Sequence, residues 1–156
     1  MFNGNSLIAF TLTIGVLGAY AQTGKRSVVL PQSEAKSLLR GGMIPKTALT
    51  ETWDPSQSEI SLLEANLNQV ATLSQRKSSY QRIEHPQNYF RQYLGLSQGH
   101  RKFIYVNAFC AELDSEPPPI WRSKLIVIDD GGSCVWQALY DMSANKFIRL
   151  SVNGVG

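Results

Sequence analysis

The sequence lacks any concentration of charge. Its net charge is +3, and its basic residues occur only in short, scattered groups, such as Lys25-Arg26, Arg76-Lys77 and His100-Arg101-Lys102. A protein that binds nucleic acid usually gathers such residues on one face or in one run. The charge pattern therefore argues against nucleic acid as the partner and predicts an ordinary solvated surface; the alternative is a weak attraction to an acidic partner or an anionic surface.

The sequence also lacks an apolar run long enough to cross a membrane at its amino end. Residues 7–21 are apolar and uncharged, but a spanning helix needs roughly 20 such residues. The run ends in Ala19-Tyr20-Ala21, the small-x-small pattern that signal peptidase reads. We predict that residues 1–21 are a signal peptide, that the mature chain begins at Gln22, and that it is periplasmic or secreted with no stable membrane insertion. The alternatives are an uncleaved anchor and a buried first helix.

Motifs for cofactors and metals are missing as well. Gly131-Gly132 is not followed by the Gly-Lys-Ser or Gly-Lys-Thr of a phosphate loop. The acidic residues nearby do not have the spacing of a calcium loop; they are Asp114, Glu116, Asp129 and Asp130. We therefore predict no cofactor and no metal.

The chain has only two cysteines, Cys110 and Cys134. In an exported protein such an even pair favours a disulfide, which would stabilise the fold by roughly 3 kcal/mol on the chain-entropy model. In a simple meander the two residues would lie at opposite ends of the sheet, too far apart to be joined. The disulfide therefore also predicts that the Pro-rich connection, residues 112–119, carries the chain back toward Cys110.

A thiol enzyme is the catalytic alternative. It requires Cys110 to be a free nucleophile beside a base. The candidate partners are His85, His100 and the carboxylates of Asp129 and Asp130, and no local pattern brings them to Cys110.

The residues that are present predict one main helix. In residues 58–74 the apolar side chains recur at spacings of three and four, which places them on a single stripe; they are Ile60, Leu63, Leu67, Val70 and Leu73. A stripe of this kind needs a surface to cover, and a sheet downstream would serve. Residues 22–50 show no sustained period, apart from a short helix expected over residues 33–40.

Strands are predicted in the second half of the chain. Residues 88–96, 102–109 and 147–152 alternate in polarity or are rich in β-branched and aromatic side chains. Residues 125–128 and 135–140 are predicted to form a β-hairpin around residues 129–132, because aspartate and glycine tolerate the turn conformation. The expected fold is α+β, with one amphipathic helix packed on an antiparallel sheet of four or five strands, in a single domain over residues 51–156.

One strand offers a candidate binding surface. In residues 102–109, Ile104, Val106 and Ala108 share an aliphatic face that we assign to the core. The opposite face carries aromatic and polar side chains. We predict that a recognition surface includes Tyr105, Asn107, Phe109 and, from the following strand, Trp136.

Several segments resemble small exported bacterial proteins of unknown function. They are RQYLG (91–95), FIYVNAFC (103–110), DGGSC (130–134) and the closing NGVG (153–156). The resemblance implies a helix on an antiparallel sheet, similar in outline to cystatin-like domains. Inhibitors, binding modules and enzymes all occur with this fold outline, so the outline does not identify a function.

From these observations the expected function is that of an exported, non-enzymatic module that binds another protein, for example as an immunity protein or inhibitor. The alternatives are a small hydrolase or transferase that uses Cys110, and a structural envelope protein anchored by residues 7–21.

Overall fold

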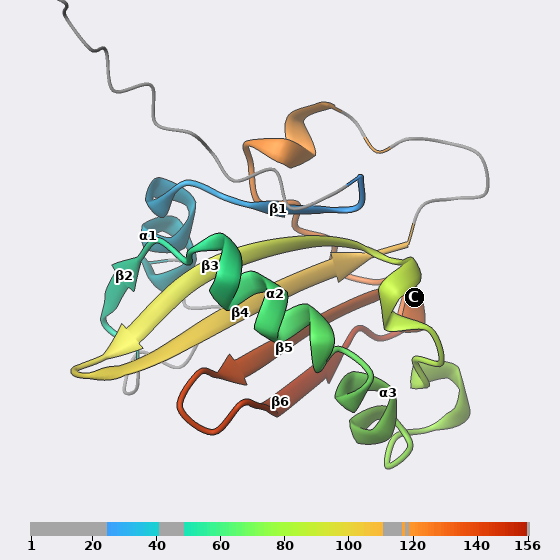
Figure 1. Cartoon of the computed structure of the whole chain (residues 1–156). Helices are drawn as coiled ribbons and strands as arrows, with labels where there is room; N and C mark the ends of the chain where they lie inside the picture. The colour runs from blue at the N-terminus through green and yellow to red at the C-terminus, as the bar shows by residue number, and fades with distance from the viewer. Residues whose placement is uncertain (1–24, 41–48, 111–116, 118, 156) are drawn as a thin grey trace, which may run out of the picture.

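The computed structural model describes residues 25–40, 49–110, 117 and 119–155 (Figure 1). The predicted signal peptide and most of the Pro-rich connection lie outside these residues. None of the helices in the described ranges is long and apolar enough to cross a membrane.

Within the described residues, six strands form one sheet and three helices pack against it. The strands are β1 (Ser27–Val29), β2 (Glu51–Trp53), β3 (Phe90–Gln98), β4 (Arg101–Phe109), β5 (Val135–Asp141) and β6 (Lys146–Val152). The helices are α1 (Gln32–Arg40), α2 (Gln57–Ala65) and α3 (Gln69–Ser74), and short 3-10 turns occur at Ser79–Gln81, Pro86–Asn88, Pro119–Arg122 and Gly132–Cys134. The predicted α+β class is confirmed, with one strand more than the expected four or five.

The strands β3 to β6 pair in chain order, each antiparallel to the next. The outer edge of β3 is shared by two strands of three residues each: β1 runs parallel to its first half and β2 antiparallel to its second half. Gly95 lies where β2 crosses, and a Cβ atom at this position would collide with the carbonyl oxygen of Trp53. The close approach of β2 therefore requires glycine at position 95.

The predicted long helix is interrupted, because residues 66–68 turn between α2 and α3. Ser56 caps α2 through a capping box with Glu59: the Ser56 Oγ accepts a bond from the Glu59 amide, and the Glu59 carboxylate accepts one from the Ser56 amide. Asn66 closes α2, and its side chain donates to the Leu62 carbonyl and the Tyr140 hydroxyl. Asparagine side chains compete with helical backbone bonds, which accounts for the break.

The face of the sheet beneath α2 and α3, called here the helix face, carries the main apolar core. The predicted core residues Ile104, Val106 and Ala108 are all fully buried there. The apolar stripe of the two helices covers them; Ile60, Leu63, Leu67 and Val70 are buried as expected.

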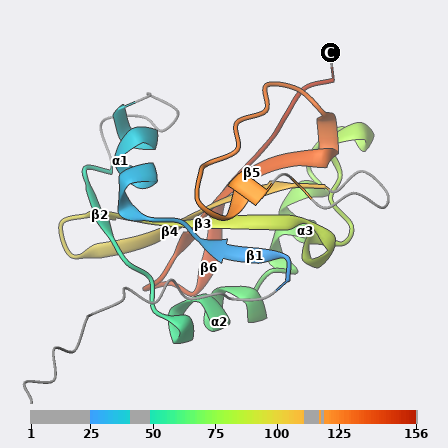
Figure 2. The same cartoon turned by 90° about the horizontal axis from the view of Figure 1, so that it is seen from above.

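The opposite face is covered by different elements. Figure 2 shows α2 on one side of the sheet, with α1 and the chain that follows residue 119 on the other. Phe90, Phe109 and Trp121 pack their rings together on this side. Trp121 thus anchors the end of the Pro-rich connection, whereas the neighbouring Ile120 is exposed.

The predicted hairpin over residues 125–140 is wrong in its first half. Residues 125–128 form no strand, and β4 pairs directly with β5. These residues belong to an irregular segment, residues 124–130, which crosses the second face of the sheet and is called the strap below. We call the face that it crosses the strap face.

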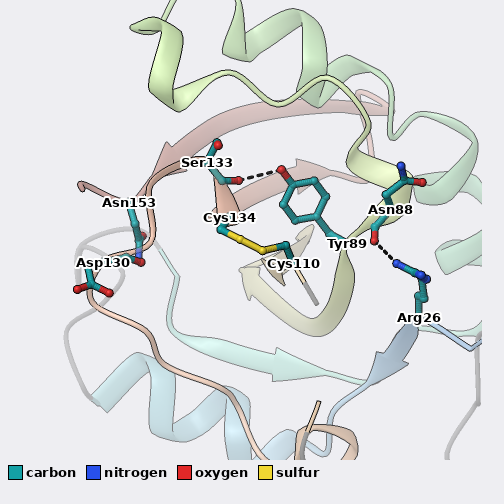
Figure 3. Close-up of a disulfide and its surroundings, with 8 residues drawn as sticks. All are labelled: Arg26, Asn88, Tyr89, Cys110, Asp130, Ser133, Cys134 and Asn153. Atoms are coloured by element: carbon teal, nitrogen blue, oxygen red, sulfur yellow. Dashed lines mark hydrogen bonds between the residues drawn. A yellow bond between two sulfur atoms is a disulfide. The ribbon is translucent and has the colours of Figure 1, made fainter. Parts of the chain in front are cut away.

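The direct pairing of β4 with β5 also explains the disulfide. Phe109 is opposite Val135 in the ladder, so Cys110 and Cys134 follow at the same end, with their Cα atoms 5.0 Å apart (Figure 3). The Cys110 amide donates a hydrogen bond of 2.8 Å to the Cys134 carbonyl. The predicted pair is therefore confirmed, and the geometric difficulty disappears because no strand intervenes.

Candidate functional site

Polar side chains form a row across the strap face. Because alternate residues of a strand point to the same side, the ladder register places them next to one another on four strands. The row consists of Gln92, Asn107, Gln137 and Ser151. A second row beside it consists of Leu94, Tyr105, Leu139 and Arg149.

The first half of the polar row holds the strap in place. Gln92 accepts a 2.9 Å bond from the Ile126 amide and donates to the carbonyls of Trp121 and Lys124. Asn107 donates to the Ile126 carbonyl at 2.8 Å and to the Gln92 side chain at 2.9 Å. Both amide side chains are buried. They supply the backbone partners that a neighbouring strand would otherwise supply.

The strap is anchored at both ends. At its start, Glu34 of α1 accepts bonds of 3.0 Å from the Lys124 ammonium and from the Leu125 amide, and these bonds hold the pKa of the Glu34 carboxyl below its usual value against the opposing effect of desolvation. At its far end, the Asn153 side chain donates to the carbonyls of Ile128 and Asp130. Figure 3 shows Asn153 next to Asp130.

Between Ile126, which Gln92 and Asn107 hold, and Ile128, which Asn153 holds, the strap makes no hydrogen bond in the described ranges. Neither the amide nor the carbonyl of Val127 makes a hydrogen bond within the described ranges, and the same is true of the side chains of Gln137 and Ser151. A cavity of about 290 Å³ lies here. Its apolar wall includes Leu125, Ile126 and Leu139, and its polar wall includes Tyr105, Asn107, Gln137, Arg149 and Ser151.

Two side chains give the cavity its chemistry. Burial raises the pKa of Tyr105, and its hydroxyl has no hydrogen-bond partner among the residues that the structure describes. Tyr105 is therefore a neutral donor or acceptor at ordinary pH. Arg149 is exposed at the cavity and has no ion pair or hydrogen bond of its side chain with any described residue.

The structure does not place the four predicted binding residues on one surface. Tyr105 and Asn107 line the cavity. Phe109 is 6% exposed and packs in the aromatic cluster, so it presents no ring to a partner. Trp136 is opposite Ala108 in the ladder and is fully buried on the helix face. The idea that these four residues share one exposed surface is therefore wrong for Phe109 and Trp136.

The residues of the thiol alternative are not brought together. Cys110 is joined to Cys134, and His100 lies in the turn at the other end of β4, about 30 Å along a strand of nine residues. His85 is exposed before the turn at Pro86–Asn88. The carboxylates of Asp129 and Asp130 lie on the exposed strap, not in a hairpin turn.

A second polar cluster lies at the edge of the helix face. Burial raises the pKa of Tyr93 well above its usual value, and its hydroxyl bonds to Glu64, which also pairs with Arg91 at 3.2 Å. The remaining donors of Arg91 go to the carbonyls of Pro86, Gln87 and Tyr89. This cluster borders an open cavity of about 540 Å³. Its donors are already used within the protein, so we interpret it as a structural connection between β3, α2 and the turn at Pro86–Asn88.

Sequence reasoning missed Arg149, Gln137, Ser151 and Asn153. The alternation of Arg149 and Ser151 with apolar residues in β6 is visible in the sequence. The strand register that places these two residues beside Gln137 and under the strap cannot be read from the sequence. No group of three or more histidine, cysteine, aspartate or glutamate side chains suited to a metal occurs in the described part of the chain.

Comparison of the chain with protein-family models, with curated proteins and with solved structures found no match. The resemblance to exported bacterial proteins and to cystatin-like domains therefore stays a prediction. The cavity beneath the strap is the feature from which a function is argued below.

Proposed function

We propose that this protein is an exported, non-enzymatic module that binds another protein through the strap and the cavity beneath it. The observation that carries the proposal is the combination of an exposed apolar segment with unpartnered polar groups. Val127 is 60% exposed and Ile128 37% exposed. Exposed apolar residues that are contiguous, and rimmed by polar ones, are typical of a protein-interaction site.

The backbone of the strap supports the same proposal. The amide and carbonyl of Val127 make no hydrogen bond in the described ranges, so they are open to a partner's main chain. The segments on either side are fixed by Gln92, Asn107 and Asn153. A partner would therefore meet a pre-ordered surface and would lose little free energy in ordering it.

Export is part of the proposal. It rests on the apolar run of residues 7–21 and on the Cys110–Cys134 disulfide. Structural disulfides form and persist mainly in oxidising compartments. An immunity or inhibitor role is the specific version that we favour, because such proteins act by docking and need no catalytic group.

The binding proposal is tested by crosslinking and affinity capture from the cell envelope of the source organism. The doubly substituted variant Val127→Ser/Ile128→Ser is compared with the wild type. Ile120→Ser is the matched control, because Ile120 is also an exposed aliphatic residue, at 54%. We expect one partner to be captured by the wild type and the control and lost with the strap variant. Capture that is equal for all three proteins would contradict the proposal, as would failure to capture a partner.

Export is tested by the intact mass of the protein from its native compartment, before and after reduction and alkylation. We expect a mature chain that begins at Gln22, with a mass increase from alkylation only after reduction. A full-length chain with free thiols would overturn export.

A further inference from the structure

We propose that the cavity beneath the strap binds the carboxy-terminal residue of the partner polypeptide, with an apolar side chain inside the cavity and the terminal carboxylate on Arg149. This inference rests on the proposed function and specifies the group that is recognised. The size of the cavity, its walls and its unpaired charge each support it.

The size of the cavity fits one residue. Ligand pockets in proteins commonly span about 300–1,000 Å³, and this cavity of about 290 Å³ is at the lower end of that range. An amphipathic helix needs a long groove that accepts several side chains. A single side chain with its terminal group is therefore the better fit.

The walls of the cavity divide into an apolar part and a polar part. The apolar part comes from the strap and from Leu139 of β5. An aliphatic or aromatic side chain would remove this surface from water at roughly 25 cal/mol per Å² of apolar area. On the polar side, Gln137, Ser151 and the Tyr105 hydroxyl have no partner in the described chain. They offer donors and acceptors to the last peptide group of a bound chain.

The unpaired positive charge of Arg149 favours a carboxylate as the bound group. Arg149 lines the cavity, and no described carboxylate lies within ion-pair distance of it. A guanidinium binds a carboxylate through two parallel hydrogen bonds. Asp129 lines the same cavity but is on the strap, near the end held by Asn153. With one positive and one negative group at the cavity, a monoanion suits it better than a phosphate dianion.

The experiment measures peptide binding to the purified mature protein by fluorescence anisotropy. The probes are labelled hexapeptides that end in Gly-Leu with a free carboxylate, the same peptides with a carboxamide end, and unlabelled 4-methylpentanoate as a competitor. We expect the free-acid peptide to bind at least about tenfold more tightly than the amide. Equal affinity of the two peptides, or no binding of either at millimolar concentration, would overturn the inference.

Variants identify the residue that is responsible. Arg149→Gln should weaken binding of the free-acid peptide about tenfold and leave the amide unchanged, and Arg149→Lys should restore part of the affinity. Arg76→Gln is the control, because Arg76 is likewise exposed. A free-acid affinity that Arg149→Gln does not change would overturn the inference. Competition by 4-methylpentanoate as strong as that of the peptide would overturn a polypeptide terminus as the source of the carboxylate.

Capture from the cell envelope separates this inference from the proposed function. If Arg149→Gln loses the partner that the wild type captures, both are supported. If Arg149→Gln retains the partner while Val127→Ser/Ile128→Ser loses it, the proposed function holds and the terminal carboxylate is excluded. Circular dichroism and thermal unfolding confirm that each variant is folded before it is used.

Discussion

The two faces of the sheet are built by the same strands but are covered in different ways. On the helix face, apolar side chains such as Trp136 and Tyr140 pack against α2 and α3. On the strap face, the buried amides of Gln92 and Asn107 hold an extended segment by its backbone. Apolar packing is non-directional and fills space. Hydrogen bonds fix only the atoms that they join. The strap is held up to Ile126 and again from Ile128, whereas Val127 makes no hydrogen bond in the described ranges and a cavity lies beside it.

This difference suggests that the two faces contribute differently to stability and to binding. Among the described residues both faces bury an apolar cluster, the larger one on the helix face, and burial of apolar side chains is the dominant favourable contribution to folding. The strap face supplies an ordered surface with unused polar groups. The following predictions test this difference between the two faces, beginning with the largest effect on the free energy of unfolding.

The largest expected effect is on the helix face. Trp136→Ala should lower the free energy of unfolding by about 3–5 kcal/mol, because it removes a fully buried side chain and leaves a cavity. Leu139→Ala, on the same strand but only partly buried on the strap face, should cost about half as much or less. Urea denaturation measures both. Equal losses would contradict this expectation.

The disulfide joins the ends of β4 and β5, the two central strands, whose side chains contribute to both faces of the sheet. Cys110→Ser/Cys134→Ser should lower the free energy of unfolding by about 3 kcal/mol, because the unfolded chain gains freedom when the loop is opened. Chemical denaturation of this variant and of the reduced wild type should give similar values. A loss below about 1 kcal/mol would indicate that ladder pairing alone holds these ends together.

Gln92 tests how the strap is held. Gln92→Leu should cost about 2 kcal/mol, because the buried carbonyls and the amide that it bonds would be left without partners. Hydrogen exchange should accelerate at the Ile126 amide and stay unchanged in β5. Gln87→Leu is the control, because the Gln87 side chain is exposed. Unchanged exchange at Ile126 would mean that Gln92 does not hold the strap.

Asp141 gives the β5–β6 turn its own pH dependence. A hydrogen bond from the Ser143 hydroxyl, together with bonds from Arg101 and from two backbone amides, lowers the pKa of the Asp141 carboxyl to about 2. Since the folded-state pKa lies below the unfolded one, this stabilisation is present above about pH 4 and is lost as the pH falls toward 2. It amounts to about 2 kcal/mol.

The measurement for Asp141 is chemical denaturation between pH 2 and 5. Asp141→Asn should be less stable at neutral pH and should lose less stability on acidification than the wild type. Part of the slope should remain, because the pKa values of Glu34 and Glu59 are lowered as well. An identical pH slope in the two proteins would contradict the assignment.

The smallest effect on stability is expected at Gln137. Its side chain is half-buried and has no hydrogen-bond partner in the described chain. Gln137→Ala should therefore change the free energy of unfolding by less than about 0.5 kcal/mol. The same variant should weaken binding of the free-acid peptide. A large loss of stability would show that Gln137 is structural and not part of a binding site.

The main elements of the fold were predictable because their signals are local. The apolar stripe of residues 60–73 and the alternation in β4 follow directly from the geometry of a helix and a strand. The Cys110–Cys134 pair followed from composition. The strands β1 and β2 were not predictable, since three residues are too few to show a period and both depend on the edge of β3.

The strap and the candidate site show why prediction failed elsewhere. Residues 125–128 have the composition of a buried strand, but no strand pairs with them: Gln92 and Asn107 bond the backbone of Ile126 only. Alternation correctly placed Tyr105 and Asn107 on the face opposite the helix-face core. It did not place Trp136, because the direction of a side chain on β5 depends on a register that only the folded sheet defines.

The absence of a side chain at Gly95 also bears on how the protein behaves at high concentration. Alanine at this position would push β2 away from β3 and uncover the backbone groups of Gly95 to Ser97, which β2 now occupies. An uncovered strand edge is a template for intermolecular pairing. Gly95→Ala would then favour self-assembly into β-rich aggregates even if the core stayed intact. Glycine, which has a hydrogen atom where other residues have Cβ, keeps this strand edge covered by β2.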